Sequence, residues 1–249
     1  MSKGRPWTNS TPPGDRQFGE TRWSIVLAAG HRSSPDSRRA LESLCQTYWY
    51  PLYAYVRRRV LDVHEAQDLT QAFFASLLER NSLEAAHRER GRFRSFLLTA
   101  FKHFLADEWD KAKALKRGGG RRAIPLDLDS GESRYAHEAT ENVSPERLYE
   151  KQWALTFLDR VLNRLGDEFI AKGKERHFEV LKPFLVGEAQ QNSYENAARA
   201  LGISEAAAKV AVHRARRRYR EILRAEIAET VAGPQEIDDE IRQLRAALG

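Results

Sequence analysis

Residues 193–224 read SYENAARALGISEAAAKVAVHRARRRYREILR, which is the pattern of two helices joined by a tight turn. Ser193 can cap the first helix, and Gly202 can end it, because helices commonly end on a residue with positive φ. Ser204 can then cap a second helix. This order of cap, glycine and cap predicts a helix-turn-helix.

The predicted second helix has one apolar face and several basic ones. The side chains expected to face the core recur at helical spacing: Ala208, Val212, Ala215, Tyr219 and Ile222. The basic side chains lie on the other faces: Lys209, His213, Arg214, Arg216, Arg217 and Arg220. Small alanines let the two helices cross closely, which leaves the start of the second helix free to enter a DNA major groove. An arginine-rich helix in an ordinary bundle is the alternative, because arginine is a good helix former.

Charged residues are distributed unevenly along the chain. The net charge is +6 at pH 7, and the stretch KAKALKRGGGRR at residues 111–122 contains no acid. Acids gather instead near the C-terminus, at Glu236, Asp238, Asp239 and Glu240. The basic excess favours a polyanionic partner such as a nucleic acid, and the acidic tail can attract the basic segments.

Composition limits the class of protein and its compartment. The chain has 249 residues, 41% of them hydrophobic, which is enough for one large or two small cores. Cys45 is the only cysteine, so we expect neither a disulfide nor a cysteine metal cluster. The N-terminus lacks the apolar run of a secretion signal, and no stretch approaches the roughly 20 apolar residues of a membrane helix. We therefore expect a cytoplasmic protein without membrane contact.

Helical periodicity is nearly continuous and strand signals are scarce, which predicts an all-α fold. Three glycines at 118–120 and a polar stretch after them interrupt the pattern. Ser144, Pro145 and Glu146 then supply the cap, proline and acid of a new helix start. The chain is therefore expected to contain a disordered tail (1–20), a first helical block (21–117), a flexible linker (118–143), a second helical block (144–232) and a C-terminal extension helix (233–249).

The segment 41–59 carries an unusually aromatic stripe, and Pro51 inside it predicts a kink. The members of the stripe are Leu44, Tyr48, Leu52 and Tyr55. Aromatic packing in a helical core explains this pattern at least as well as a binding role does.

Residues 65–80 have the pattern of a helix with two distinct faces. One face is apolar: Ala66, Leu69, Phe73 and Leu77. The other face is mostly polar: Asp68, Gln71, Ala75 and Glu79. The polar face can dock a basic partner helix, although simple solvation is the more common reason for such a face.

Residues 91–113 predict a helix that is apolar over more than one stripe. The positions expected in the core are Phe93, Leu97, Ala100 and Phe104. Further aromatic side chains flank this stripe: Phe96, Phe101 and Trp109. Exposed aromatics beside lysines can stack on unpaired bases, but a broad apolar surface also suits the central helix of a bundle. Periodicity does not separate these two interpretations.

The order and spacing of these segments resemble one known family. The segments are YWYPLYAYVRRR, EAQDLTQAFFASLL, FRSFLLTAFKHFLADEW, a basic glycine-containing linker and SYENAARALGISEAAAKVAVHRARRR. Over about residues 41–223 the chain resembles an extracytoplasmic-function sigma factor, the minimal two-domain class of bacterial sigma factors. Each motif alone is of weak to moderate specificity, and their order makes the resemblance strong.

The resemblance implies that the first block is sigma domain 2 and the second block is sigma domain 4. It implies core RNA polymerase and promoter DNA as partners, an anti-sigma protein as a further candidate partner, and no cofactor. In this family an acidic-polar helix of domain 2 docks on the coiled-coil clamp of the polymerase. The corresponding residues here are Asp68, Gln71 and Phe74.

The resemblance also implies two sets of DNA contacts. The loop 80–92 and the following helix correspond to the surface that traps a flipped base of the minus-ten element, with the candidates Arg80, His87, Lys102 and His103. His103 stands where relatives often carry asparagine, which leaves the preferred base open. The positions that correspond to base reading in the minus-thirty-five element are Lys209, Val210, His213 and Arg214. Arg216 and Arg217 correspond to positions nearer the phosphates, which orient a protein without specifying sequence.

Two other functions compete with this interpretation. A stand-alone helix-turn-helix repressor accounts for residues 193–224 but leaves the aromatic first block unexplained. An enzyme has little support, because the seven histidines are scattered without an HExxH pair and the glycines at 118–120 are not followed by the GK[ST] of a P-loop. We therefore expect no catalytic site and no metal site. Binding to core polymerase distinguishes a sigma factor from a repressor.

Overall fold

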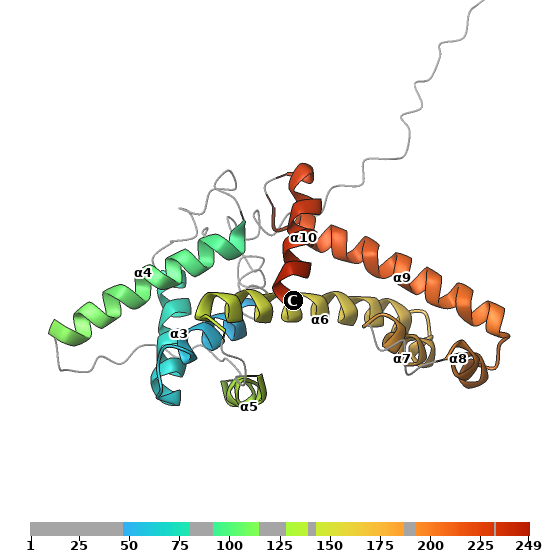
Figure 1. Ribbon diagram of the computed structural model, residues 1–249, viewed down its shortest axis with the longest axis horizontal. Coiled ribbons are helices and arrows are strands. Elements are labelled where there is room, and N and C mark those ends of the chain that lie inside the picture. The colour runs from blue at the N-terminus through green and yellow to red at the C-terminus, as the bar shows by residue number, and fades with distance from the viewer. Residues whose placement is uncertain (1–46, 80–91, 115–127, 139–142, 187–192, 232) are drawn as a thin grey trace, which may run out of the picture.

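The structure is a computed structural model that describes residues 47–79, 92–114, 128–138, 143–186, 193–231 and 233–249. Every regular element in these ranges is a helix, and they contain no strand, as the periodicity predicts (Figure 1). The tail predicted at 1–20 lies outside the described residues. None of the described helices is long and apolar enough to cross a membrane.

Residues 47–57 form the first described helical segment, and the α-helices that follow are α3 (Val63–Glu79), α4 (Phe93–Ala114), α5 (Leu128–Glu138), α6 (Pro145–Ile170), α7 (Glu175–Leu181), α8 (Tyr194–Leu201), α9 (Glu205–Ala228) and α10 (Ile237–Leu248). Two short 3-10 helices, η2 (Lys182–Phe184) and η4 (Pro234–Glu236), follow α7 and precede α10. Along the longest axis, α3 and α4 lie at one end, α8 and the start of α9 lie at the other, and α6 runs between them (Figure 1).

The helical segment 47–57 is buried on nearly all sides. The stripe members Tyr48, Leu52 and Tyr55 are each 1% exposed or less, as expected, but Tyr53 and Val56 on other faces are equally buried. Pro51 lies inside this segment, and the helix continues through it. The segment is therefore the central helix of the first block, which explains its aromatic content without a binding role.

Helices α3 and α4 pack their predicted apolar faces into the same core, with one shift in α4. Ala66, Phe73 and Leu77 of α3 are buried. In α4 the buried apolar positions follow one another at intervals of four residues: Phe93, Leu97, Phe101 and Leu105. Ala100 and Phe104, which we expected in this stripe, are half-buried instead. Phe101 takes the central place because its ring packs 4.7 Å from that of Phe73, centroid to centroid.

Helix α5 lies inside the stretch 118–143 that the sequence predicts to be a linker, so that prediction is wrong for residues 128–138. Gly131 lets α5 approach closely, since a Cβ there would meet the Trp49 ring at 2.8 Å. Glu132 accepts a hydrogen bond from the Tyr53 hydroxyl and pairs with Arg57 at 3.1 Å. Burial raises the pKa of Glu132, but these two hydrogen bonds outweigh it and hold the pKa below its usual value. Polar contacts hold this helix together with the buried Tyr135 ring, and hydrophobic periodicity cannot detect the polar contacts.

Helix α6 connects the two predicted blocks. Ser144 caps it by accepting a hydrogen bond from the Arg147 backbone N–H, and Pro145 is its first residue, as predicted. Its buried residues include Trp153 near the first block and Leu165 near the helix-turn-helix. One continuous core runs from the segment 47–57 through α6 to α9 and α10. The described parts of the two blocks therefore share a core.

Candidate nucleic-acid interface

The helix-turn-helix forms through the local signals that the sequence supplies. Ser193 caps α8 by accepting a hydrogen bond from the Asn196 backbone N–H. Gly202 ends α8 with a φ of 66°, a value that a residue without Cβ adopts at no steric cost. Ser204 caps α9 by accepting from the Ala207 backbone N–H. All three predicted roles are confirmed.

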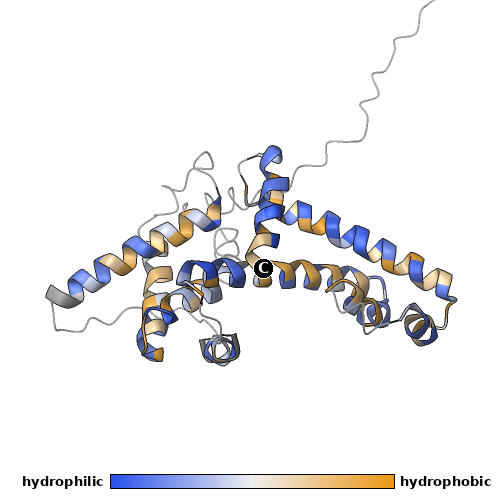
Figure 2. Ribbon diagram, in the orientation of Figure 1, coloured by the Kyte–Doolittle hydropathy of each residue, from blue (hydrophilic) through white to orange (hydrophobic). Residues whose placement is uncertain are grey.

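A small separate core holds this motif together. Its buried members come from α7, η2, α8 and the first half of α9: Leu181, Phe184, Ala197, Ala198, Ala208, Val212 and Ala215. Most of them on α8 and α9 are alanines, so the two helices can cross closely. The side of α9 away from this core is exposed and mostly hydrophilic, in contrast to the more apolar α6 beside it (Figure 2).

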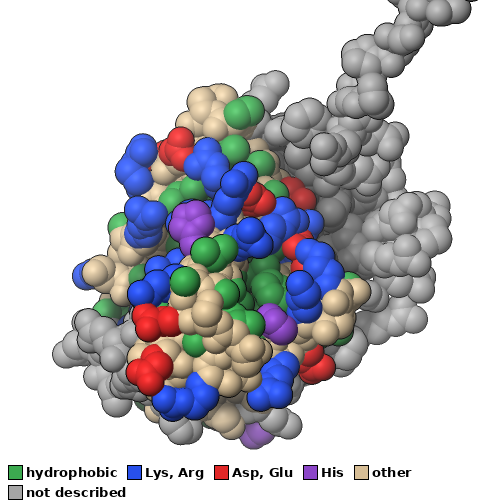
Figure 3. Space-filling view, turned by 90° about the vertical axis from the view of Figure 1, so that its right-hand side faces the viewer, with side chains coloured by type: hydrophobic (Ala, Val, Ile, Leu, Met, Phe, Trp, Pro, Cys, Tyr) green, Lys and Arg blue, Asp and Glu red, His purple; other side chains and the backbone are tan. Residues whose placement is uncertain are grey.

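The exposed side of α9, which we call the outer face, consists of Lys209, Val210, His213, Arg214, Arg217 and Arg220. Lys and Arg side chains, with His among them, gather on this end of the molecule (Figure 3). Val210 is 49% exposed although it is apolar, and such a side chain can contact a thymine methyl group in a major groove. The outer face thus combines positive charge with a group suited to contact base edges.

Two cations of the outer face pair with exposed acids of the same helix. Lys209 pairs with Glu205 at 2.7 Å, and Arg217 pairs with Glu221 at 3.0 Å. The Glu205 hydrogen bond raises the pKa of Lys209, so this amine is charged near neutral pH. Exposed pairs of this kind are weak and are screened by salt. Both side chains can therefore exchange their carboxylate partners for DNA phosphates.

Two other arginines of α9 contact neighbouring elements of the fold. Arg216 is half-buried and donates from Nε and Nη2 to the Phe184 carbonyl oxygen at 3.2 and 3.0 Å. We expected this residue near a phosphate, and that assignment is corrected, because its guanidinium satisfies the carbonyl at the end of η2. Arg218 pairs with Glu168 of α6 at 2.6 Å, and its hydrogen bond lowers the pKa of Glu168.

Helix α3 exposes part of the polar face that the sequence predicts. Asp68 is exposed and Gln71 is half-buried, so both are accessible on one side of α3. Phe74 is only 3% exposed and packs against Phe73 with the ring centroids 5.7 Å apart. Its assignment to a polymerase-binding surface is therefore corrected, because its side chain belongs to the core. Ala75 is also buried, which narrows the accessible polar face.

Helix α4 carries the described part of the predicted minus-ten set. His103 is exposed, whereas the Lys102 Nζ pairs with Glu146 of α6 at 2.9 Å. Arg80 and His87 lie outside the described residues. Sequence reasoning missed Arg59, whose guanidinium lies over the Tyr55 ring at 5.1 Å and over the Trp109 ring at 5.8 Å. In the sequence, only the run of three arginines at 57–59 pointed to this residue.

The two predicted DNA-contacting sets lie in opposite halves of the molecule. Helix α4 runs from one end of the longest axis to the middle, near α10, and the start of α9 lies at the other end (Figure 1). The described residues contain no group of His, Cys, Asp and Glu side chains that could hold a metal ion. No family model, curated protein or solved structure matches this chain. The functional argument therefore depends on the residues and their geometry.

Proposed function

We propose that the protein is a sigma factor of the extracytoplasmic-function type, which binds core RNA polymerase and directs promoter recognition, DNA melting and transcription initiation. The observation that carries the proposal is the capped helix-turn-helix whose second helix exposes a basic outer face. The helical first block supports it, because its exposed Asp68 and His103 stand where the resembled family binds polymerase and the minus-ten element.

In this proposal the second block is sigma domain 4, and α9 enters the major groove of the minus-thirty-five element. Lys209, His213 and Arg214 supply donors for base edges, and Val210 supplies an apolar contact. Arg217 and Arg220 lie further along the helix and face the phosphates. Arg216 keeps its structural contact with Phe184 and is not part of the DNA-binding set.

The first block is then sigma domain 2, with Asp68 and Gln71 facing the polymerase clamp and His103 facing the minus-ten element. The two proposed DNA-binding surfaces are separated along the longest axis, which suits a protein that contacts two spaced promoter elements (Figure 1). A stand-alone helix-turn-helix regulator is the second candidate, because the basic outer face alone would serve it equally well. Core polymerase binding separates the two candidates.

The outer face of α9 allows a direct test of base reading. Arg214→Ala is expected to cost about 1 to 3 kcal/mol of binding and to relax the preference at one or two upstream base pairs. Arg217→Ala is expected to weaken binding to all sequences equally. It should also lower, by about one, the slope of the logarithm of the binding constant against the logarithm of the salt concentration. Selection of bound sequences from a promoter library, followed by salt titration, measures both effects. An unchanged sequence preference for Arg214→Ala would contradict the assignment.

Helix α3 allows a test of polymerase binding. Asp68→Arg is expected to reduce affinity for core RNA polymerase, because it reverses an exposed charge on the proposed docking face. Asp107→Arg is the matched control, since it reverses an exposed acid on a different helix, α4. A pull-down with purified core polymerase measures the affinity, and circular dichroism checks that both variants remain helical. Equal affinities for wild type and Asp68→Arg would remove α3 from the polymerase interface.

A further inference from the structure

A buried cluster of charges joins α10 to α4 and α6. The Arg94 side chain is 4% exposed and that of Glu240 is 1% exposed, and their Nε and Oε1 atoms lie 2.8 Å apart. Arg94 also pairs with Glu150 of α6 and lies over the Trp153 ring at 4.4 Å. Its Nη2 donates to the Gln243 side-chain oxygen at 2.7 Å. Helix α10 therefore supplies one of the two carboxylates that pair with this buried cation of α4.

Arg92 forms a second connection between the same elements. It precedes α4 and pairs with Asp239, and its Nε lies 2.5 Å from a Glu240 oxygen. The Arg92 side chain is 23% exposed and that of Asp239 is 41% exposed, so this part of the contact is open to solvent. Acids of the first turn of α10 thus occupy the arginine donors at the start of α4.

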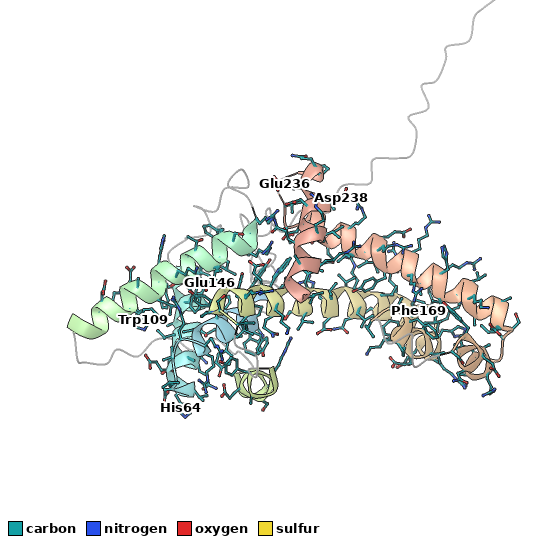
Figure 4. The ribbon with its side chains drawn as sticks, in the orientation of Figure 1. His64, Trp109, Glu146, Phe169, Glu236 and Asp238 are labelled. Carbon is teal, nitrogen blue, oxygen red and sulfur yellow. The ribbon has the colours of Figure 1, made fainter. Side chains whose placement is uncertain are left out.

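The other sides of α10 are attached to the second block. Leu244 is 3% exposed in the shared core, and Asp238 pairs with Arg224 of α9 at 2.5 Å. Figure 4 places Asp238 and Glu236 where α10 approaches the end of α9, with Glu146 below them on α6. Helix α10 therefore touches α4, α6 and α9 at once, and it ties the first block to the helix-turn-helix block.

We propose that α10 is an intramolecular latch, which restrains the DNA-binding surface at the start of α4 in the free protein. This inference rests on the proposed function. Arg92 stands at the end of the loop expected to contact the minus-ten element, and guanidinium groups bind phosphate oxygens as readily as carboxylates. Asp239, which is open to solvent, therefore occupies a place that a DNA phosphate would take. Because DNA and α10 compete for the same donors, DNA binding and latch opening are coupled.

A pair of neighbouring acids provides a matched test. Asp239→Asn removes a carboxylate that binds Arg92, whereas Asp238→Asn removes one that binds Arg224 of α9. Both changes take one negative charge from the first turn of α10. Asp239→Asn is expected to bind labelled single-stranded DNA of mixed sequence about two- to fivefold more tightly than Asp238→Asn does, both as full chains. A change of this size is what the loss of one partly exposed ion pair would produce.

Hydrogen exchange gives a second readout that does not depend on DNA. Asp239→Asn is expected to speed amide exchange in α10 and at the start of α4, while exchange in α8 stays unchanged. Faster exchange together with tighter DNA binding supports the latch. Equal DNA affinities for the two variants, whatever the exchange, would overturn it and leave α10 as a packing element. Failure of the proposed function would be seen separately, as wild-type protein that directs no transcription with core polymerase.

Discussion

Glu240→Ala is expected to lower the free energy of unfolding by about 3 to 5 kcal/mol, the usual cost of removing one partner of a buried ion pair. The variant leaves the guanidinium of Arg94 4% exposed without the carboxylate that lies 2.8 Å from its Nε. Glu150 remains as a partner, but it belongs to α6 and is 32% exposed, so it replaces only part of the lost interaction. Urea unfolding followed by circular dichroism measures the change.

Two further variants separate the charge effect from simple loss of packing. The double variant Arg94→Met, Glu240→Leu is expected to recover most of the stability, because well-packed apolar residues can replace a buried pair at little cost. Asp238→Asn is expected to leave the free energy of unfolding nearly unchanged, because its pair with Arg224 is exposed. A loss below about 1 kcal/mol for Glu240→Ala would mean that this carboxylate is hydrated and that α10 does not anchor α4.

The helix-turn-helix could be predicted from the sequence because its determinants are local. Ser193, Gly202 and Ser204 act on backbone groups within a few residues, so the caps and the turn appear directly in the order of residues. The same holds for the start of α6 at Ser144 and Pro145. Helical periodicity also placed Ala208, Val212, Ala215 and Ile222 in the core, with Tyr219 half-buried beside them, because one side of α9 faces solvent.

Contacts between distant segments could not be predicted in this way. Helix α5 docks through Gly131, Glu132 and polar partners from the segment 47–57, and no periodic pattern encodes such pairing. The contact of Glu240 with Arg94 joins residues 146 positions apart, and a net charge asymmetry gave only the general expectation that tail and basic segments attract. Charge pattern indicates attraction but not the partner.

Errors at single residues have a common physical cause. Phe74 follows Phe73 in the sequence, and the core around α3 is wide enough to bury both rings. The side of α3 that we expected to be accessible is therefore partly buried. Arg216 lies among exposed arginines, yet it reaches the Phe184 carbonyl because η2 ends beside it. In both cases a neighbouring element decides the exposure, and the sequence of the helix itself does not contain that information.

His103→Ala is expected to leave closed-complex formation nearly intact and to reduce DNA opening near the start site. Melting requires that unstacked bases are captured by the protein, and the stacking of one base is worth about 1 to 3 kcal/mol, or roughly a five- to 150-fold change in the opening equilibrium. His103 is exposed on α4, so its ring is available to a flipped base, whereas Phe93 and Leu97 are buried and unsuitable as tests. Permanganate reactivity of thymines, with core polymerase and a cognate promoter, measures the opening.

Asp107→Ala is the control for His103→Ala. Asp107→Ala removes an exposed acid one turn further along α4, and loss of a carboxylate near DNA is not expected to reduce opening. Deletion of Ser82 to Ala86, in the stretch 80–91 outside the described residues, is expected to act like His103→Ala, because that stretch belongs to the same proposed trapping surface. Normal opening with both His103→Ala and the deletion would mean that the trapping surface lies elsewhere. Absence of opening with the wild-type protein would favour the stand-alone helix-turn-helix regulator, because a repressor binds duplex DNA without capturing single bases.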